Sequence, residues 1–182
     1  MKYPPLGKVF WFCGTNEGIA QDCVDWALDA LCEGIDSPSL RILAGLESPL
    51  NSFEVRDYTK KTLKELGIRE LVGEEAVLAY SRDLAEEIIE RRESLRANLK
   101  ALFTLCHTND YLSEIYDFYL LECTYTDFDY QDFQYYWEGA TKENVEDILI
   151  EKCQTFIDSY DKRAEPGESG QLLSLRSLRA TS

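Results

Sequence analysis

Few residues of this 182-residue chain have the types and spacing of a catalytic site. His107 is the only histidine, and it directly follows Cys106. Adjacent residues on a helix point in different directions, so this pair is poorly placed for activation of a thiol nucleophile. A histidine near a helix C-terminus, where the helix dipole favours it, is the simpler interpretation. We therefore expect no Cys–His nucleophile.

The carboxylates and cysteines do not follow known metal-site patterns either. The sequence has no Cys-x-x-Cys pair and no Glu-x-x-His motif of the kind that binds metals in helical bundles. The glutamates of residues 86–93 have Arg82, Arg91 and Arg92 among or near them, which is typical of a solvated helix face with ion pairs. Glycine motifs for phosphate binding and a G-x-S-x-G motif are absent. We expect no enzyme, cofactor or metal, with a carboxylate enzyme that carries no motif as the alternative.

The clearest signal is for binding, in a block of residues 110–138 that has no Lys, Arg or His. Its eight acids are Asp110, Glu114, Asp117, Glu122, Asp127, Asp129, Asp132 and Glu138. Its eleven aromatics, half of those in the chain, are Tyr111, Tyr116, Phe118, Tyr119, Tyr125, Phe128, Tyr130, Phe133, Tyr135, Tyr136 and Trp137. Aromatic anchors with surrounding carboxylates are typical of a surface that binds a cationic partner. The alternative is that the aromatics are core and the acids are their solvated face.

The charge distribution indicates what such a partner would be. The whole chain has a formal net charge of −15, and residues 108–160 hold 13 acids against 2 bases. Such a field repels nucleic acids and anionic membranes and attracts basic proteins. We expect contact residues at the end of the block: Asp127, Asp129, Tyr130, Asp132, Tyr135, Tyr136 and Trp137.

The elements that must position these residues are predicted to be helices. Apolar spacing and capping signals predict helices at residues 16–33, 37–48, 51–67, 74–92, 94–106, 113–123 and 141–160. The sequence leaves open whether residues 74–92 and 94–106 are one bent helix or two, and whether the next helix starts at Asp110 or at Ser113. Ser37 before Pro38, and Asn51 three residues before Glu54, are typical helix starts. Residues 8–13 are predicted to be an extended arm, and residues 124–139 an irregular segment. The fold class is all-α, a compact bundle or irregular stack of about six to seven helices.

The predicted domain organisation is one helical domain over residues 1–160 and a flexible C-terminal tail over residues 161–182. Residues 165–170 have the composition of a linker, and leucines and arginines follow them. The first residues lack the apolar region of a secretion signal, and no stretch has the length of a membrane span. We therefore expect a cytoplasmic protein with reduced cysteines.

Small size, helical content, acidity and a tyrosine-rich acidic segment give the chain a resemblance to bacterial immunity proteins. In those that bind colicin nucleases, an Asp-rich helix precedes a Tyr-Tyr-Pro step, and residues 129–137 are similar, with Trp137 in place of the proline. Residues 26–68 also look like a segment of uncharacterised bacterial proteins. The immunity-protein resemblance implies an inhibitor that blocks a toxin or a nucleic-acid-binding enzyme. The alternative is a helical adaptor or structural subunit of a larger assembly.

Overall fold

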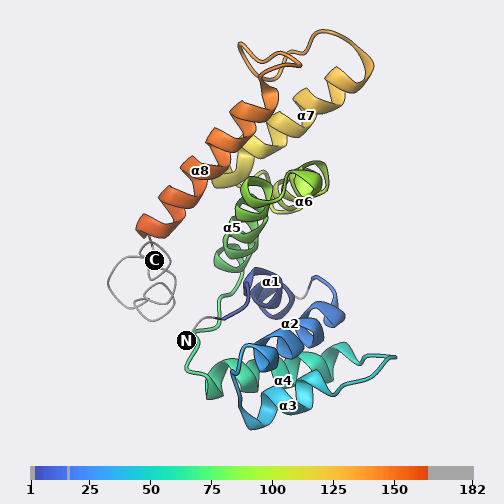
Figure 1. Ribbon diagram of the computed structural model, residues 1–182, viewed down its shortest axis with the longest axis vertical. Helices are drawn as coiled ribbons and strands as arrows, with labels where there is room; N and C mark the ends of the chain where they lie inside the picture. The colour runs from blue at the N-terminus through green and yellow to red at the C-terminus, as the bar shows by residue number, and fades with distance from the viewer. Residues whose placement is uncertain (1–2, 16, 164–182) are drawn as a thin grey trace. The chain divides into compact units, whose positions relative to one another are not determined.

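The computed structural model describes residues 3–15 and 17–163, and this part of the chain contains helices and no strand. The predicted all-α class is confirmed. Eight α-helices, rather than six to seven, follow one another here (Figure 1). They are α1 (Gly7–Thr15), α2 (Ala20–Cys32), α3 (Pro38–Ala44), α4 (Ser52–Glu65), α5 (Glu74–Glu90), α6 (Leu95–Thr108), α7 (Tyr116–Tyr130) and α8 (Val145–Arg163), with 3-10 helices η1 (Arg92–Ser94) and η2 (Ser113–Ile115). The described residues fall into two compact units, divided within α5 between Tyr80 and Ser81.

The first unit contains the clearest departure from the sequence prediction. Residues 8–13 are not an extended arm, because they lie in α1, with Val9, Phe10, Phe12 and Cys13 buried. These positions have the spacing that turns one face of a helix into a core. Aromatic and β-branched residues favour strands locally, but here the contacts of α1 with α2 and α4 decide the conformation.

Close packing of α1 against the segment before α5 depends on a glycine. A β-carbon at Gly14 would lie 2.4 Å from the carbonyl oxygen of Leu71. The carbonyl of Gly14 also accepts a hydrogen bond from the Gly73 N–H at 3.1 Å. Any side chain at position 14 would therefore push these two segments apart.

The helix starts predicted at Ser37 and Asn51 are confirmed. The Ser37 hydroxyl accepts a hydrogen bond from the Leu40 N–H at 3.3 Å, and the Asn51 carboxamide accepts one from the Phe53 N–H at 3.0 Å. The Glu65 carboxylate, at the end of α4, accepts from the Ser39 N–H at 2.9 Å and from its hydroxyl at 2.6 Å. These bonds lower the pKa of Glu65 and hold the start of α3 against α4.

In the second unit, α7 and α8 lie side by side, and residues 131–144 connect them (Figure 1). The rings of Phe118 and Phe156 meet edge to face, 5.6 Å apart, and Lys152 pairs with Asp117 at 3.1 Å. Helix α6 packs on α7. The buried apolar side chains of this unit include Leu84, Ile88, Leu95, Leu99, Leu102, Leu105, Ile115, Phe118, Leu121, Val145, Leu149 and Ile157.

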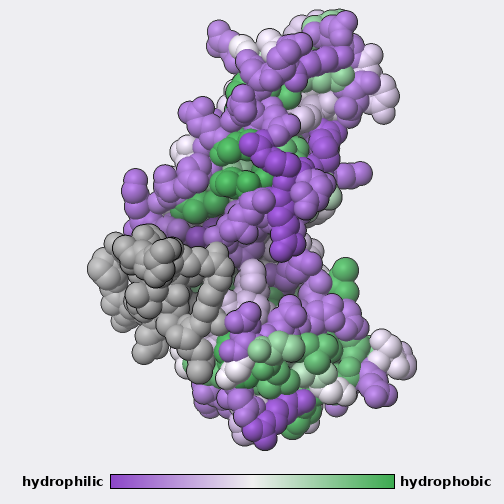
Figure 2. Space-filling model, in the orientation of Figure 1, coloured by the Kyte–Doolittle hydropathy of each residue, from purple (hydrophilic) through white to green (hydrophobic). Residues whose placement is uncertain are grey.

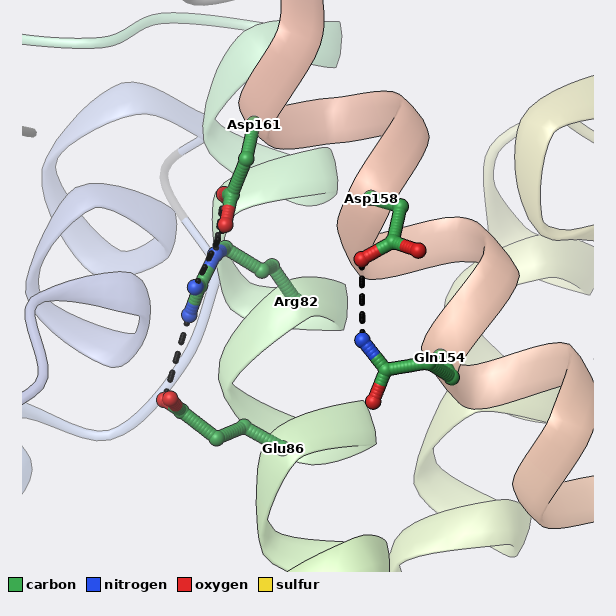
Figure 3. Close-up of polar contacts among 5 residues, drawn as sticks. All are labelled: Arg82, Glu86, Gln154, Asp158 and Asp161. Atoms are coloured by element: carbon green, nitrogen blue, oxygen red, sulfur yellow. Dashed lines mark hydrogen bonds and ion pairs between the residues drawn. The ribbon is translucent and has the colours of Figure 1, made fainter. Parts of the chain in front are cut away.

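A nearly buried arginine connects the last turns of α8 to α5. Arg82 donates from Nε to Asp161 at 2.7 Å and from Nη1 to Glu86 at 3.1 Å (Figure 3). On the solvent side of α8, Gln154 donates to Asp158 at 2.8 Å. Since both partners of Arg82 are carboxylates, its charge is compensated where water has limited access.

The remaining boundaries differ in detail from the predictions. Residues 74–92 and 94–106, which the sequence left open as one bent helix or two, form the separate helices α5 and α6, with η1 between them. Asp161 to Arg163 belong to α8, and the rest of the predicted tail lies outside the described residues. The single domain over residues 1–160 stays a prediction beside the two units described above. Within residues 3–15 and 17–163, no helix combines the length and apolar character needed to cross a membrane.

Candidate functional site

The acidic aromatic block forms η2, α7 and the connection to α8, so it divides between core and surface. Phe118 is 1% exposed, and Phe128 is also buried. Tyr119, Tyr125 and Trp137 are half-buried. Some aromatics of the block are therefore core residues, and others lie at the surface.

Helix α7 continues through Tyr130, seven residues into the segment predicted to be irregular. Thr124 stabilises this extension, because its hydroxyl donates to the Leu120 carbonyl at 2.9 Å and its side chain is buried. The helix ends where Gln131 adopts an extended backbone. The irregular segment is therefore shorter than predicted, and we call residues 131–144 the tip loop.

The tip loop is organised by the side chain of Gln134. Its Oε1 accepts hydrogen bonds from the Tyr136 N–H at 2.7 Å and the Trp137 N–H at 2.8 Å, and from the Thr124 hydroxyl at 3.5 Å. Its Nε2 donates to the carbonyls of Trp137 and Ala140. One carboxamide thus satisfies four backbone groups that would otherwise need water, which fixes the path of the loop.

This loop and the end of α7 present four exposed aromatic side chains, which we call the aromatic tip: Tyr130, Phe133, Tyr135 and Tyr136. Tyr130 is 87% exposed and Tyr135 is 86% exposed. The rings of Phe133 and Tyr135 are in edge contact, 5.5 Å apart. The face of the molecule in Figure 2 is largely hydrophilic over this loop, since its tyrosines and acids have low hydropathy. Tyrosine rings on an ordered loop are well suited to binding, because Tyr and Trp are enriched at the hot spots of interfaces.

Five of the seven predicted contact residues are exposed: Asp129, Tyr130, Asp132, Tyr135 and Tyr136. The other two, Asp127 and Trp137, are half-buried. Trp137 serves the loop itself, since its N–H and carbonyl both bond to Gln134 and the Lys152 ammonium lies 5.1 Å from its ring. Asp127 accepts the N–H of Gln131 with its backbone carbonyl at the end of α7. Tyr130, Tyr135 and Tyr136 are therefore the predicted aromatic contact residues that lie exposed, whereas Trp137 belongs to the structure of the loop.

Several acids of the block have basic partners from other segments. Asp129 pairs with Arg96 at 3.0 Å, and Asp132 pairs with Lys142 at 2.8 Å, which lowers the pKa of Asp132. Arg96 also lies 3.6 Å from Glu122 and covers the ring of Tyr125, 4.7 Å from its centroid. Arg96 on α6 and Lys142 in the tip loop thus neutralise part of the negative charge of the block. These pairs hold the acids in place and leave their outer faces exposed to solvent.

Burial also acts on two titratable side chains of α7, Glu122 and Tyr125. Burial raises the pKa of the Glu122 carboxyl and raises the pKa of Tyr125 to about 12. The Tyr125 hydroxyl is buried without a hydrogen-bond partner. Within the part of the chain that the structure describes, no group of His, Cys, Asp and Glu has the arrangement of a metal site.

Sequence reasoning did not find Gln134 or Arg96. A glutamine between two aromatics carries no pattern by itself, and Arg96 lies 33 residues from Asp129. The density of tyrosines in one acidic segment is visible in the sequence, but which of them are exposed is not.

Comparison with known proteins gives no guide to the site. No family model matches the chain, and neither the curated proteins nor the solved structures contain a match. The function is therefore argued from the residues alone.

Proposed function

We propose that this chain is an acidic binding protein that sequesters a basic protein partner through the aromatic tip. The observation that carries the proposal is the near-complete exposure of Tyr130, at the end of α7, and of Tyr135, on the loop fixed by Gln134. A loop already ordered before binding loses less entropy when it meets its partner, so its aromatic contacts translate more fully into affinity. In this proposal the chain acts in the cytoplasm, which the free thiols of its cysteines support.

The acids and the aromatics have different roles in this mechanism. Residues 108–160 carry 13 acids and 2 bases, which steers a cationic protein toward this end of the second unit. Tyrosine rings then supply stiff contact area with a polar hydroxyl, which slows dissociation. An inhibitor of a nuclease or of another nucleic-acid-binding enzyme, of the immunity-protein or nucleic-acid-mimic type, would use this combination. The partner's basic channel would be the surface that the tip occupies.

The decisive experiment compares aromatic variants on a partner captured from the native cell by the full chain and then purified. The Tyr130→Ala/Tyr135→Ala double variant should weaken binding by about 2 kcal/mol or more, roughly 30-fold, chiefly through faster dissociation. Its melting temperature should not change, because both side chains are exposed. Phe53→Ala is the matched control, since Phe53 is 83% exposed on α4 and lies outside the block.

Two results would contradict the proposal. One is a captured partner that is acidic, or whose association rate is the same at low and high salt, since steering by surface charge weakens as salt rises. The other is equal affinity of the double variant and the Phe53→Ala control.

The alternative, a helical adaptor, is favoured by one specific observation on the first unit. Phe53, Val72 and Ile19 are exposed there, on a unit that has its own buried core. An adaptor would bind one partner through this unit and another through the tip. Partner capture from the native cell by the Phe53→Ala variant and by the Tyr130→Ala/Tyr135→Ala variant distinguishes an adaptor from an inhibitor. An adaptor should lose one partner with the first variant and a different partner with the second.

A further inference from the structure

A second aromatic surface lies at the other end of α7 from the tip, where α6 meets η2. Five rings form a connected set that we call the Tyr111 cluster: Phe103, His107, Tyr111, Tyr116 and Tyr119. Phe103 stacks on Tyr119 at 4.7 Å, and Tyr111 meets Tyr119 edge to face at 5.2 Å. Tyr111 and Tyr116 are 47% and 40% exposed, and His107 is exposed as well. The cluster is therefore a surface and not a part of the core.

The backbone at the centre of this cluster has an unfavourable conformation. Asp110 and Tyr111 have φ angles of 52° and 57°, in the left-handed region that residues with a β-carbon seldom adopt. The turn is closed by a hydrogen bond from the Tyr111 N–H to the Cys106 carbonyl at 2.9 Å. Glycine would adopt these angles without strain, but here two residues with side chains adopt them in succession. With this backbone the Tyr111 ring contacts the rings of His107, Tyr116 and Tyr119. Strain retained at an exposed ring points to a role for that ring in function.

The charges around the cluster indicate the chemistry of its ligand. Asp110 and Glu114 lie within or beside the segment that carries three of the rings, and residues 108–119 include no Lys or Arg. Asp117 also lies there, but Lys152 on α8 pairs with it at 3.1 Å. Elsewhere the chain places its own cations on ring faces, with Arg96 on Tyr125 at 4.7 Å and Arg56 on Phe12 at 4.6 Å. Among the described residues no Lys or Arg is placed in this way on a ring of the Tyr111 cluster.

We infer that the Tyr111 cluster binds an arginine side chain of a basic peptide segment. A planar guanidinium can stack on tyrosine rings and donate to neighbouring carboxylates at the same time, whereas an ammonium group is a compact, strongly hydrated charge. Tyr111 and Tyr116 supply the aromatic surface, and Asp110 supplies the negative charge. This surface is distinct from the tip, because Tyr116 and Tyr130 lie at opposite ends of the 15-residue helix α7, about 21 Å apart along its axis.

The test uses the full chain and a hexa-arginine peptide, with the ring protons of His107 observed by NMR as a reporter inside the cluster. Wild-type protein should show saturable shifts at His107. The Tyr111→Ala/Tyr116→Ala variant should bind hexa-arginine at least tenfold more weakly, as measured at His107. The Tyr111→Phe variant keeps the ring and should bind the peptide as tightly as wild type. Hexa-lysine should bind at His107 several-fold more weakly than hexa-arginine.

The control separates this surface from the tip. The Tyr130→Ala/Tyr135→Ala variant should leave the affinity at His107 within twofold of wild type, so that failure of one surface does not imply failure of the other. The inference is overturned if His107 does not respond to the peptide, or if hexa-lysine binds there as tightly as hexa-arginine. It is also overturned if Tyr111→Ala abolishes a concentration-dependent dimer, because the cluster would then bind a second copy of this chain.

Discussion

Replacement of Gln134 by alanine should loosen the tip loop without unfolding the protein. The side chain makes four hydrogen bonds with backbone groups of Tyr136, Trp137 and Ala140. At about 1 kcal/mol each these bonds would sum to roughly 4 kcal/mol, but water reaches a half-exposed loop and replaces part of them. We expect the loop to be destabilised by about 2 kcal/mol, which corresponds to roughly 30-fold less protection of its amides from hydrogen exchange.

The assay is site-resolved hydrogen exchange at the amides of Tyr136 and Trp137, which both donate to Gln134. Amides in the middle of α8 serve as the internal reference. Gln134→Glu is the matched variant, because a carboxylate keeps the two accepted bonds but cannot donate to the carbonyls of Trp137 and Ala140. It should protect the Tyr136 amide better than alanine does. Wild-type exchange rates at both amides in Gln134→Ala would refute our account of the loop.

The remaining predictions concern the core, the Arg82 contact and the cysteines. Phe118→Ala should cost about 3 to 5 kcal/mol in urea denaturation, whereas Tyr135→Ala should change stability by less than about 0.5 kcal/mol, because only Phe118 is buried. Arg82→Ala should cost about 2 kcal/mol, since Asp161 loses its partner but stays partly hydrated, and Gln154→Ala on the exposed side of α8 should be nearly neutral. Burial raises the pKa of the Cys106 thiol to about 11 and that of Cys153 to about 12. At pH 8 iodoacetamide should therefore label the exposed Cys32 but not Cys106 or Cys153, as measured by mass spectrometry. Because these folded-state values lie above the ordinary value of 9.0, the stability they contribute is present below pH 9 and should be lost as pH rises toward 11 to 12, which thermal melts can follow.

The sequence predicted those parts of the structure that depend on local chemistry. A hydroxyl before Pro38 and a carboxamide at Asn51 cap helices through bonds to the next few residues, so they are visible in a short window. Residues 8–13 were predicted incorrectly, because in a short aromatic and β-branched run the helical period is hard to recognise. The helix forms because its apolar face meets α2 and α4, and these contacts are set by tertiary structure.

The candidate site divides in the same way. The exposure of Tyr130, Tyr135 and Tyr136 agrees with the surface interpretation of the block, and the burial of Phe118 agrees with the core interpretation. The sequence could not assign these roles, because alternation between core and surface depends on where α7 ends. Nor could it show that Arg96 compensates Asp129, since that contact joins two different helices.

The hydrogen bonds of Gln134 have a consequence for how this protein can change over time. All of its partners lie between Thr124 and Ala140, so the conformation of the loop is encoded locally and does not depend on the identity of the exposed rings. Tyr130 and Tyr135 can therefore be exchanged for other residues without a cost to folding. A loop of this kind separates the residues that maintain shape from those that select a partner. It would allow specificity to diversify rapidly among related chains while α7, α8 and Gln134 stay the same.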